Sequence, residues 1–119
     1  MLAQILREAT EAGARELRHY FNNPTLKTAL KSGGVNDLVT EADHASDRAI
    51  IGVIQQHFPD HFILSEETGD VPATANYKWI IDPIDGTINF AQGIPICCVS
   101  IGIEKDGEMI MGSVYAPFL

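Results

Sequence analysis

The sequence is organised around the stretch Trp79-Ile80-Ile81-Asp82-Pro83-Ile84-Asp85-Gly86-Thr87-Ile88-Asn89-Phe90. It opens with a short apolar run typical of a buried strand, and two carboxylates, Asp82 and Asp85, follow at once. Because Pro83 restricts the residue before it to an extended conformation, we expect Asp82 to end the strand. Mg²⁺ prefers oxygen ligands in near-octahedral geometry, which carboxylates on a rigid turn supply. The stretch therefore predicts a site for a divalent metal ion.

The residues after Asp82 offer further ligands. Ile84 can bind a metal only through its backbone carbonyl, while a helix beginning near Asp85 would leave backbone N–H groups of Gly86 and Thr87 for a phosphate. The alternative is that Asp82 and Asp85 only cap turns and helix ends. If only two aspartates at this spacing were present, the capping role would be a better explanation than a metal site. The full string, placed directly after an apolar strand, favours a metal-assisted phosphoryl-transfer site.

The string from Asp82 to Phe90 resembles the signature of the inositol monophosphatase family of Mg²⁺-dependent, lithium-sensitive phosphatases. The similarity extends over essentially all 119 residues and includes Asp37-Leu38-Val39-Thr40 and Ser65-Glu66-Glu67-Thr68. The family usually has a second threonine where this chain has Ile88, so we take Thr87 as the functional hydroxyl. The resemblance implies an α+β layered sandwich, in which two long helices pack on a mainly antiparallel sheet as in sugar phosphatases.

The resemblance also implies how the metal ions are held. Two Mg²⁺ ions share Asp82; one is also bound by Glu66 and the carbonyl of Ile84, and the other by Asp85. Glu66 and Thr87 orient the water that attacks the phosphate. The expected reaction is hydrolysis of a small phosphate monoester, such as an inositol monophosphate or a sugar phosphate.

Three further roles complete the expected site. Asp85, Gly86 and Thr87 are expected to bind the substrate. The family's counterpart of Asp43 lies close to the metal site, although the residues alone favour Asp43 as a helix-start residue. Lys31 either reaches over the active site, as a lysine does in related phosphatases, or is a solvated loop charge.

Family members are longer than this chain, and their second half carries another signature with a Trp-Asp pair that completes the second metal's ligands. The resemblance therefore predicts that residues 1–119 are an N-terminal α+β metal-binding domain without its C-terminal half. We expect either a fragment or a truncated protein whose open sheet edge needs a partner.

Two helices are predicted in the first half of the chain. Residues 2–21 have apolar side chains at helical spacing, with small residues that allow close packing. Residues 27–38 contain a short strand candidate and a flexible connection. Thr40 is expected to cap the second helix, with Asp43 completing an approximate capping box, and Pro59 ends it.

Strands are predicted in the remainder. Residues 62–64 are expected to form a brief strand that is followed by Glu66. Two adjacent strands that both end in acidic residues would bring their carboxylates together. Residues 69–75 are expected to be a surface loop. Residues 96–104 and 109–115 are strands joined by a two-residue hairpin at Asp106-Gly107, and they form the floor beneath the site.

The amino-acid composition excludes some classes of partner. A formal net charge of −8 argues against nucleic acid or an anionic membrane as partner. No signal-peptide pattern or membrane-spanning stretch is seen, and the adjacent Cys97 and Cys98 are expected to be reduced core residues. We therefore expect a cytoplasmic protein, and the family resemblance implies a homodimer that acts on a small phosphorylated sugar or polyol. Two alternatives stay open: a non-catalytic regulatory or binding protein that keeps the fold, and an acidic domain that binds structural Ca²⁺.

Overall fold

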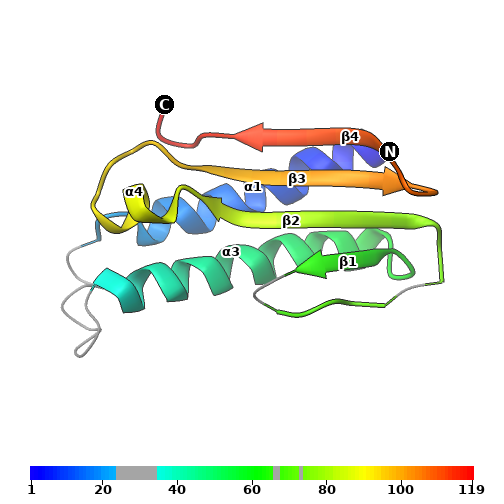
Figure 1. The fold of residues 1–119 in the computed structure, drawn as a ribbon, viewed down its shortest axis with the longest axis horizontal. Helices are drawn as coiled ribbons and strands as arrows, with labels where there is room; N and C mark the ends of the chain where they lie inside the picture. Colours follow the sequence, from blue (N-terminus) through cyan, green and yellow to red (C-terminus); the bar gives the residue numbers. More distant parts are fainter. Residues whose placement is uncertain (24–34, 66–67, 73) are drawn as a thin grey trace.

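The computed structural model of the chain describes residues 1–23, 35–65, 68–72 and 74–119, and for residues 35–38 only the backbone. The elements in chain order are α1 (Leu2–Tyr20), α3 (Val35–His57), β1 (Phe62–Ser65), β2 (Tyr77–Asp85), α4 (Thr87–Ala91), β3 (Cys98–Lys105) and β4 (Glu108–Tyr115). The strands form one sheet in the order β1-β2-β3-β4, with α1 and α3 running alongside it (Figure 1). The predicted fold class, two long helices on a mainly antiparallel sheet, is confirmed.

Helix α1 packs against α3 through its small residues, as the sequence predicts. Gly13 lies at a close contact between the two helices: a Cβ there would come within 2.8 Å of Ile50 Cδ1 and 2.9 Å of Ser46 Oγ. Ile50 and Ser46 are fully buried. A glycine at this point therefore lets the two helices meet without displacing core side chains.

The predicted start of the second helix is wrong. Helix α3 begins at Val35, so Thr40 and Asp43 lie inside it and do not form a capping box. For the same reason Val35–Leu38 is helical and not part of a strand; the rest of the strand candidate lies outside the described residues. A capping preference is local and weak compared with the tertiary packing that stabilises a helix of 23 residues.

The sheet is mixed. β1 runs parallel to β2, and β2, β3 and β4 pair antiparallel in sequence order. The predicted hairpin is confirmed: Asp106 (φ 52°) and Gly107 (φ 84°) are both in the left-handed region, as a two-residue turn of this type requires. The predicted surface loop after β1 is partly paired, because Val71 forms an antiparallel bridge with Ile63.

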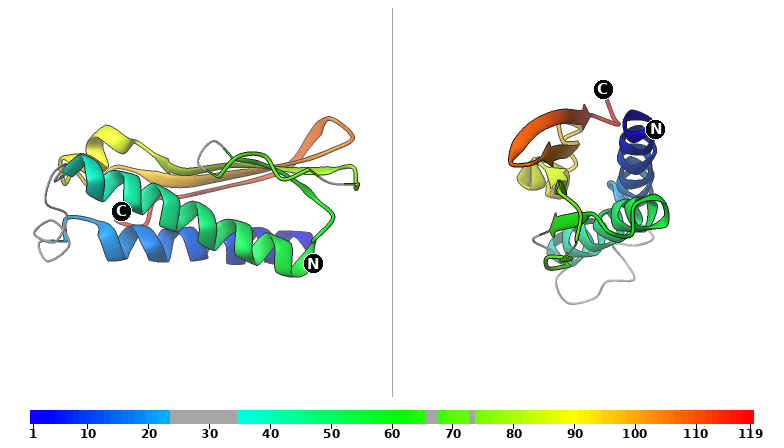
Figure 2. Two further views of the ribbon diagram at one scale, coloured as in Figure 1. Left: turned by 90° about the horizontal axis from the view of Figure 1, so that it is seen from below. Right: turned by 90° about the vertical axis from the view of Figure 1, so that its right-hand side faces the viewer.

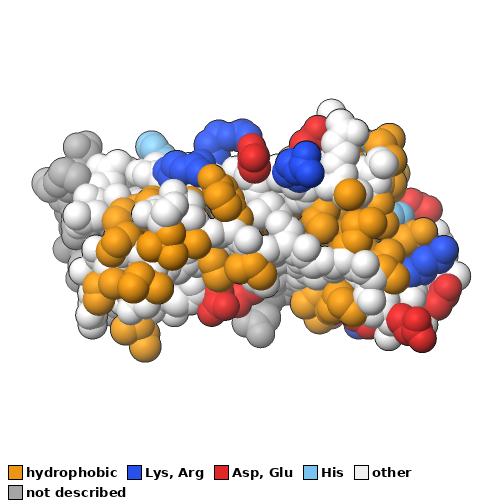
Figure 3. Space-filling model, turned by 90° about the horizontal axis from the view of Figure 1, so that it is seen from above, with side chains coloured by type: hydrophobic (Ala, Val, Ile, Leu, Met, Phe, Trp, Pro, Cys, Tyr) orange, Lys and Arg blue, Asp and Glu red, His pale blue; other side chains and the backbone are white. Residues whose placement is uncertain are grey.

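Both long helices cover the same face of the sheet (Figure 2). Along β3, Val99, Ile101 and Ile103 are buried toward the helices, whereas the alternate residues are half-buried on the opposite face. Hydrophobic side chains are exposed on the side of the molecule that carries β4 (Figure 3). They include Met109, Ile110 and Val114. In the described residues, no helix combines the length and the apolarity needed to cross a membrane.

Candidate metal and phosphate site

A bulge in β2 determines where the two aspartates of the central stretch lie. Asp82 pairs with Ser100 of β3, and Asp85 pairs with Cys98, so that three steps along β2 match two along β3. In a regular strand, residues three apart point to opposite faces, and the extra residue of a bulge reverses this. Asp82 and Asp85 therefore share the face of the sheet opposite the helices, where both are exposed.

The strand was predicted to end at Asp82, and this prediction is wrong because the bulge lets β2 continue to Asp85. Pro83 has no N–H to donate to the ladder, so pairing is interrupted at that point and resumes at Asp85. Pro83 and Ile84 turn into the core while the aspartates on either side remain exposed. The predicted strand end is thus a change of register within a longer strand.

Helix α3 holds the bulge from the other side. The buried hydroxyl of Ser46 donates a hydrogen bond to the carbonyl oxygen of Pro83 at 3.2 Å. Asp43 lies three residues before Ser46, almost one turn of the same helix. The residue that fixes the bulge and a predicted active-site carboxylate are therefore neighbours on one rigid element.

Gly86 and Thr87 follow directly. Gly86 has φ 96° and ψ 43° and is the N-cap of the short helix α4, which begins at Thr87, close to the predicted helix start. A Cβ on Gly86 would lie 3.0 Å from the carbonyl oxygen of Ile96, so both its φ and its surroundings require glycine. The tight turn places the exposed side chain of Thr87 immediately beyond Asp85.

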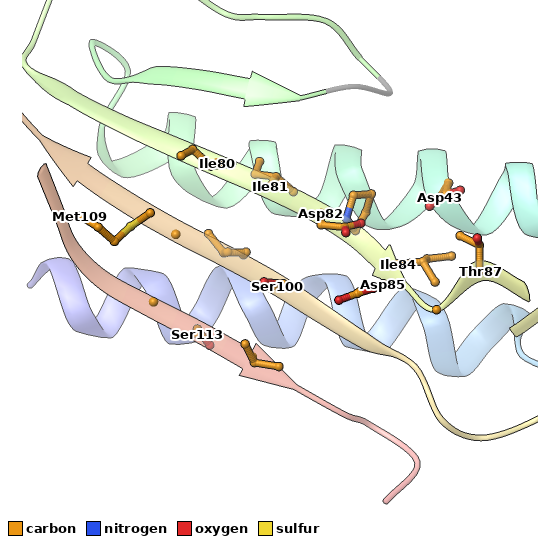
Figure 4. A pocket seen from close by; sticks show the side chains of 16 residues that line it. Asp43, Ile80, Ile81, Asp82, Ile84, Asp85, Thr87, Ser100, Met109 and Ser113 are labelled. Atoms are coloured by element: carbon orange, nitrogen blue, oxygen red, sulfur yellow. The ribbon is translucent and has the colours of Figure 1, made fainter. Parts of the chain in front are cut away.

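These side chains line one pocket of about 750 Å³. Asp82 and Asp85 come from β2, Asp43 approaches from α3, and Thr87 lies at the start of α4 (Figure 4). Ser100 and other residues of β3 and β4 form the floor of this pocket. Of the eight predicted site residues, six line this pocket: Asp43, Asp82, Ile84, Asp85, Gly86 and Thr87. Glu66 and Lys31 lie outside the described residues.

The carboxylates of the pocket affect the neighbouring thiol of Cys98. Cys98 Sγ lies 3.9 Å from Asp85 Oδ2. Burial raises the pKa of the Cys98 thiol, and the nearby carboxylates of Asp85 and Asp82 raise it further. Cys98 is half-buried beside these carboxylates, so the prediction that it is a core residue is wrong. Cys97 is buried as predicted, and both cysteines are free.

The donor set of this pocket suits a hard cation. Its polar side chains include the carboxylates of Asp43, Asp82 and Asp85 and the hydroxyls of Thr87 and Ser100, all oxygen donors of the kind that Mg²⁺ prefers. Across the described ranges, no three His, Cys, Asp or Glu side chains are grouped closely enough to hold a metal ion by themselves. Three of the predicted metal ligands, Asp82, Ile84 and Asp85, thus line this pocket, and their role as ligands stays a prediction.

One residue of this region was missed from the sequence. Asp47 on α3 is fully buried, and its Oδ2 accepts hydrogen bonds from the hydroxyls of Ser65 (2.7 Å) and Thr68. The helical spacing could have predicted that Asp47 is buried. It lies three residues before Ile50 and seven before Ile54, on the stripe of α3 that faces the core. A carboxylate on that stripe requires hydrogen-bond donors from another element.

Sequence comparison relates the chain to one family. The sequence model of the inositol monophosphatase family matches residues 1–119. Nus factor SuhB of Pasteurella multocida is 43% identical over 118 residues, which cover 98% of this chain and 43% of that protein. Inositol-1-monophosphatase of Synechocystis sp. is 39% identical over 116 residues, covering 97% of this chain and 40% of that protein.

Solved structures share the fold. Inositol monophosphatase from Anabaena matches with a TM-score of 0.75 at 38% identity, covering 98% of this chain and 41% of that one. The extragenic suppressor protein SuhB from Bartonella henselae matches with a TM-score of 0.82 at 26% identity, covering 98% and 44%. This chain thus spans less than half the length of these relatives. Because the family model, the sequence identities and the fold agree over nearly all of its residues, the chain belongs to the inositol monophosphatase family.

Proposed function

We propose that this chain is the N-terminal metal-binding domain of a Mg²⁺-dependent phosphatase that hydrolyses the monoester of a small polyol or sugar, such as an inositol monophosphate. The feature that supports this function most is the β2 bulge, which turns Asp82 and Asp85 onto one face of a pocket shared with Asp43 and Thr87. Membership of a family that is named for inositol monophosphate hydrolysis supports it independently.

In this proposal Asp82, Asp85, Glu66 and the carbonyl of Ile84 hold Mg²⁺. When bound, Mg²⁺ polarises the phosphate and lowers the pKa of a bound water. With a net charge of −8, the chain would need the positive charge of such an ion beside Asp82 and Asp85 in order to bind an anionic substrate. The buried side chain of Ile84 fixes the backbone between the two aspartates.

The remaining residues act on the water and on the substrate. The hydroxyl of Thr87, together with Glu66, orients the attacking water, and Asp43 is a supporting carboxylate in the same pocket. The backbone of Gly86 and Thr87 and the side chain of Asp85 bind the substrate, and Lys31 supplies a cation for the phosphate. We also propose that the protein works in the cytoplasm as a homodimer and shares the family's lithium sensitivity.

Phosphate release from myo-inositol 1-phosphate tests this function. The 119-residue chain is assayed with Mg²⁺ and with EDTA, next to Asp82→Asn and the matched control Asp106→Asn, which changes an exposed turn aspartate outside the pocket. We expect Asp82→Asn to lower the rate at least about 100-fold, the upper end of the loss for residues that support a metal site. EDTA should abolish turnover, and Asp106→Asn should leave the rate unchanged. Turnover that survives EDTA or Asp82→Asn would exclude the metal-dependent reaction.

A second candidate is a non-catalytic role in binding another protein. Three of the relatives carry the name Nus factor SuhB and not that of a phosphatase, and one of them is 43% identical to this chain. A stably folded chain that binds Mg²⁺ but releases no phosphate would favour this second function.

A further inference from the structure

The two residues at the centre of the β2 bulge lie outside the strand pairing. Asp82 and Asp85 both pair with residues of β3, whereas Pro83 and Ile84 between them have no partner there in the described part of the chain. The register with β1 ends earlier, at Ile81. Loss of the bulge would change the register and move Asp85 to the opposite face. Strand pairing alone therefore does not fix the segment that places both aspartates on one face.

Helix α3 contacts the bulge at this segment through one hydroxyl. Ser46 is 0% exposed, and its hydroxyl donates a hydrogen bond to the carbonyl oxygen of the buried Pro83 at 3.2 Å. Ser46 Oγ also lies against α1, because a Cβ on Gly13 would come within 2.9 Å of it. The hydroxyl is thus confined between the two helices and the bulge, and this confinement holds the donor against the Pro83 carbonyl.

The same turn of α3 carries the third carboxylate of the pocket. Asp43 lies three residues before Ser46 and lines the pocket together with Asp82 and Asp85. Three residues are almost one turn of a helix, over which the backbone hydrogen bonds keep the positions fixed. A hydrogen bond from Ser46 to the bulge therefore also sets where the two aspartates of β2 lie relative to Asp43.

We propose that Ser46 is a positioning residue for the metal site: it holds the Pro83 carbonyl toward α3 and so keeps Asp82 and Asp85 on one face, in register with Asp43. This inference rests on the proposed function, in which Asp82 and Asp85 bind Mg²⁺. Ser46 is fully buried and is not among the residues that line the pocket, so it touches neither metal nor substrate. Its effect reaches the ion through the backbone of the bulge.

Binding of Mn²⁺ alone, followed by the loss of the free-ion EPR signal, tests this role without turnover. Ser46→Ala removes the hydroxyl and keeps the Cβ. Ile54→Val is the matched control, because Ile54 is equally buried on the same helix, about two turns beyond Ser46, and lies outside the pocket. In the metal-free chain, nuclear Overhauser effects between Asp85 and Cys98 report on the register beyond the bulge. Urea unfolding of each variant reports separately on stability.

If the Ser46 hydroxyl only satisfied a buried carbonyl, its removal would lower stability without changing the affinity for Mn²⁺. We expect instead that Ser46→Ala weakens Mn²⁺ binding about tenfold, the lower end of the range for residues that orient metal ligands. It should also weaken the Overhauser effects between Asp85 and Cys98. Ile54→Val should lower stability and leave both measurements unchanged.

Three results would contradict these expectations. Ser46→Ala that keeps either the affinity or the cross-strand effects of the wild type would overturn the positioning role while leaving the proposed function intact. An equal loss of affinity in Ile54→Val would do the same, because the loss would then follow stability. A wild-type chain that binds no Mn²⁺ would overturn both the positioning role and the proposed function.

Discussion

His61 shows how a single ring is held in its uncharged form by its neighbours. It is 6% exposed, stacks between the rings of Phe58 (4.4 Å) and Tyr77 (4.6 Å), and accepts a hydrogen bond from Trp79 Nε1 at its Nδ1. Because the indole N–H can only donate, Nδ1 carries no proton in this arrangement. Burial lowers the pKa of His61, and the charge of Asp60 opposes this only in part.

The lowered pKa predicts a pH-dependent stability. The unfolded chain, with an ordinary histidine pKa of 6.5, takes up a proton before the folded one does. The free energy of unfolding should therefore fall as the pH drops through 6.5 toward the lower folded value, below which the contribution of His61 is lost. Urea unfolding of the wild type and of His61→Phe between about pH 7.5 and about pH 5.5 measures this.

The comparison with His61→Phe isolates this ring from the other titrating groups. Phenylalanine keeps the stacking but cannot be protonated, so we expect a smaller loss of stability on acidification than in the wild type. It also leaves the Trp79 N–H without its acceptor, which should lower stability at every pH. Parallel pH curves for the two proteins would rule out the assigned role of His61.

The individual carboxylates differ in how far the sequence predicts them. Asp82 and Asp85 are recognisable because they follow an apolar strand and precede Gly86. Asp47 is not, because its donors, Ser65 and Thr68, are brought to it only by the fold. A local sequence pattern predicts the role of a residue when the residues that define that role are its neighbours in sequence. It fails when the hydrogen-bond partners come from a distant part of the chain.

The contact between α1 and α3 depends on the absence of a side chain at Gly13. Gly13→Ala should lower the free energy of unfolding by about 1–2 kcal/mol, because an overpacking cost of about 1–3 kcal/mol exceeds the helix-propensity gain of up to about 1 kcal/mol. The clash would be with Ile50 and with Ser46, whose hydroxyl holds the β2 bulge. Denaturant unfolding measures the change.

Gly52 provides the matched control within the same pair of helices. It lies inside α3, is exposed, and a Cβ there would meet no atom within 4 Å. Gly52→Ala should therefore raise the free energy of unfolding by about 0.5–1 kcal/mol. Stabilisation by Gly13→Ala to the same extent would show that the helices are not closely packed at this point.

The helices and strands follow largely from periodicity and turn residues. The hairpin at Asp106-Gly107 and the end of α3 before Pro59 needed only local chemistry. The start of α3 and the bulge in β2 could not be predicted in this way. Helix α3 begins before the local capping signal at Thr40, and the bulge depends on pairing with β3. A one-residue change of register reverses which face a side chain occupies, so the location of Asp85 could not be derived from β2 alone.

The molecule as a whole is a two-layer structure with one face of its sheet open. The helices cover the inner face, while the pocket with Asp43, Asp82 and Asp85 lies against the outer face and the end of β2. Exposed hydrophobic residues on β4 adjoin this open face, and an edge strand of this kind favours pairing with another chain segment. The family resemblance predicted the layered sandwich, but only the three-dimensional register shows why Asp82 and Asp85 occupy the same face of the sheet.

The central claim is that α3 and β2 bring their carboxylates into one pocket that binds divalent ions. The anomalous difference density of Mn²⁺ in a crystal of the chain tests this most directly, because it locates the ion without depending on turnover. We predict a peak at bonding distance, about 2.0–2.2 Å, from carboxylate oxygens of Asp82 and Asp85. Crystals of Asp82→Asn grown with the same Mn²⁺ should lose it. Manganese found only at other acidic residues, with none between Asp82 and Asp85, would contradict the claim.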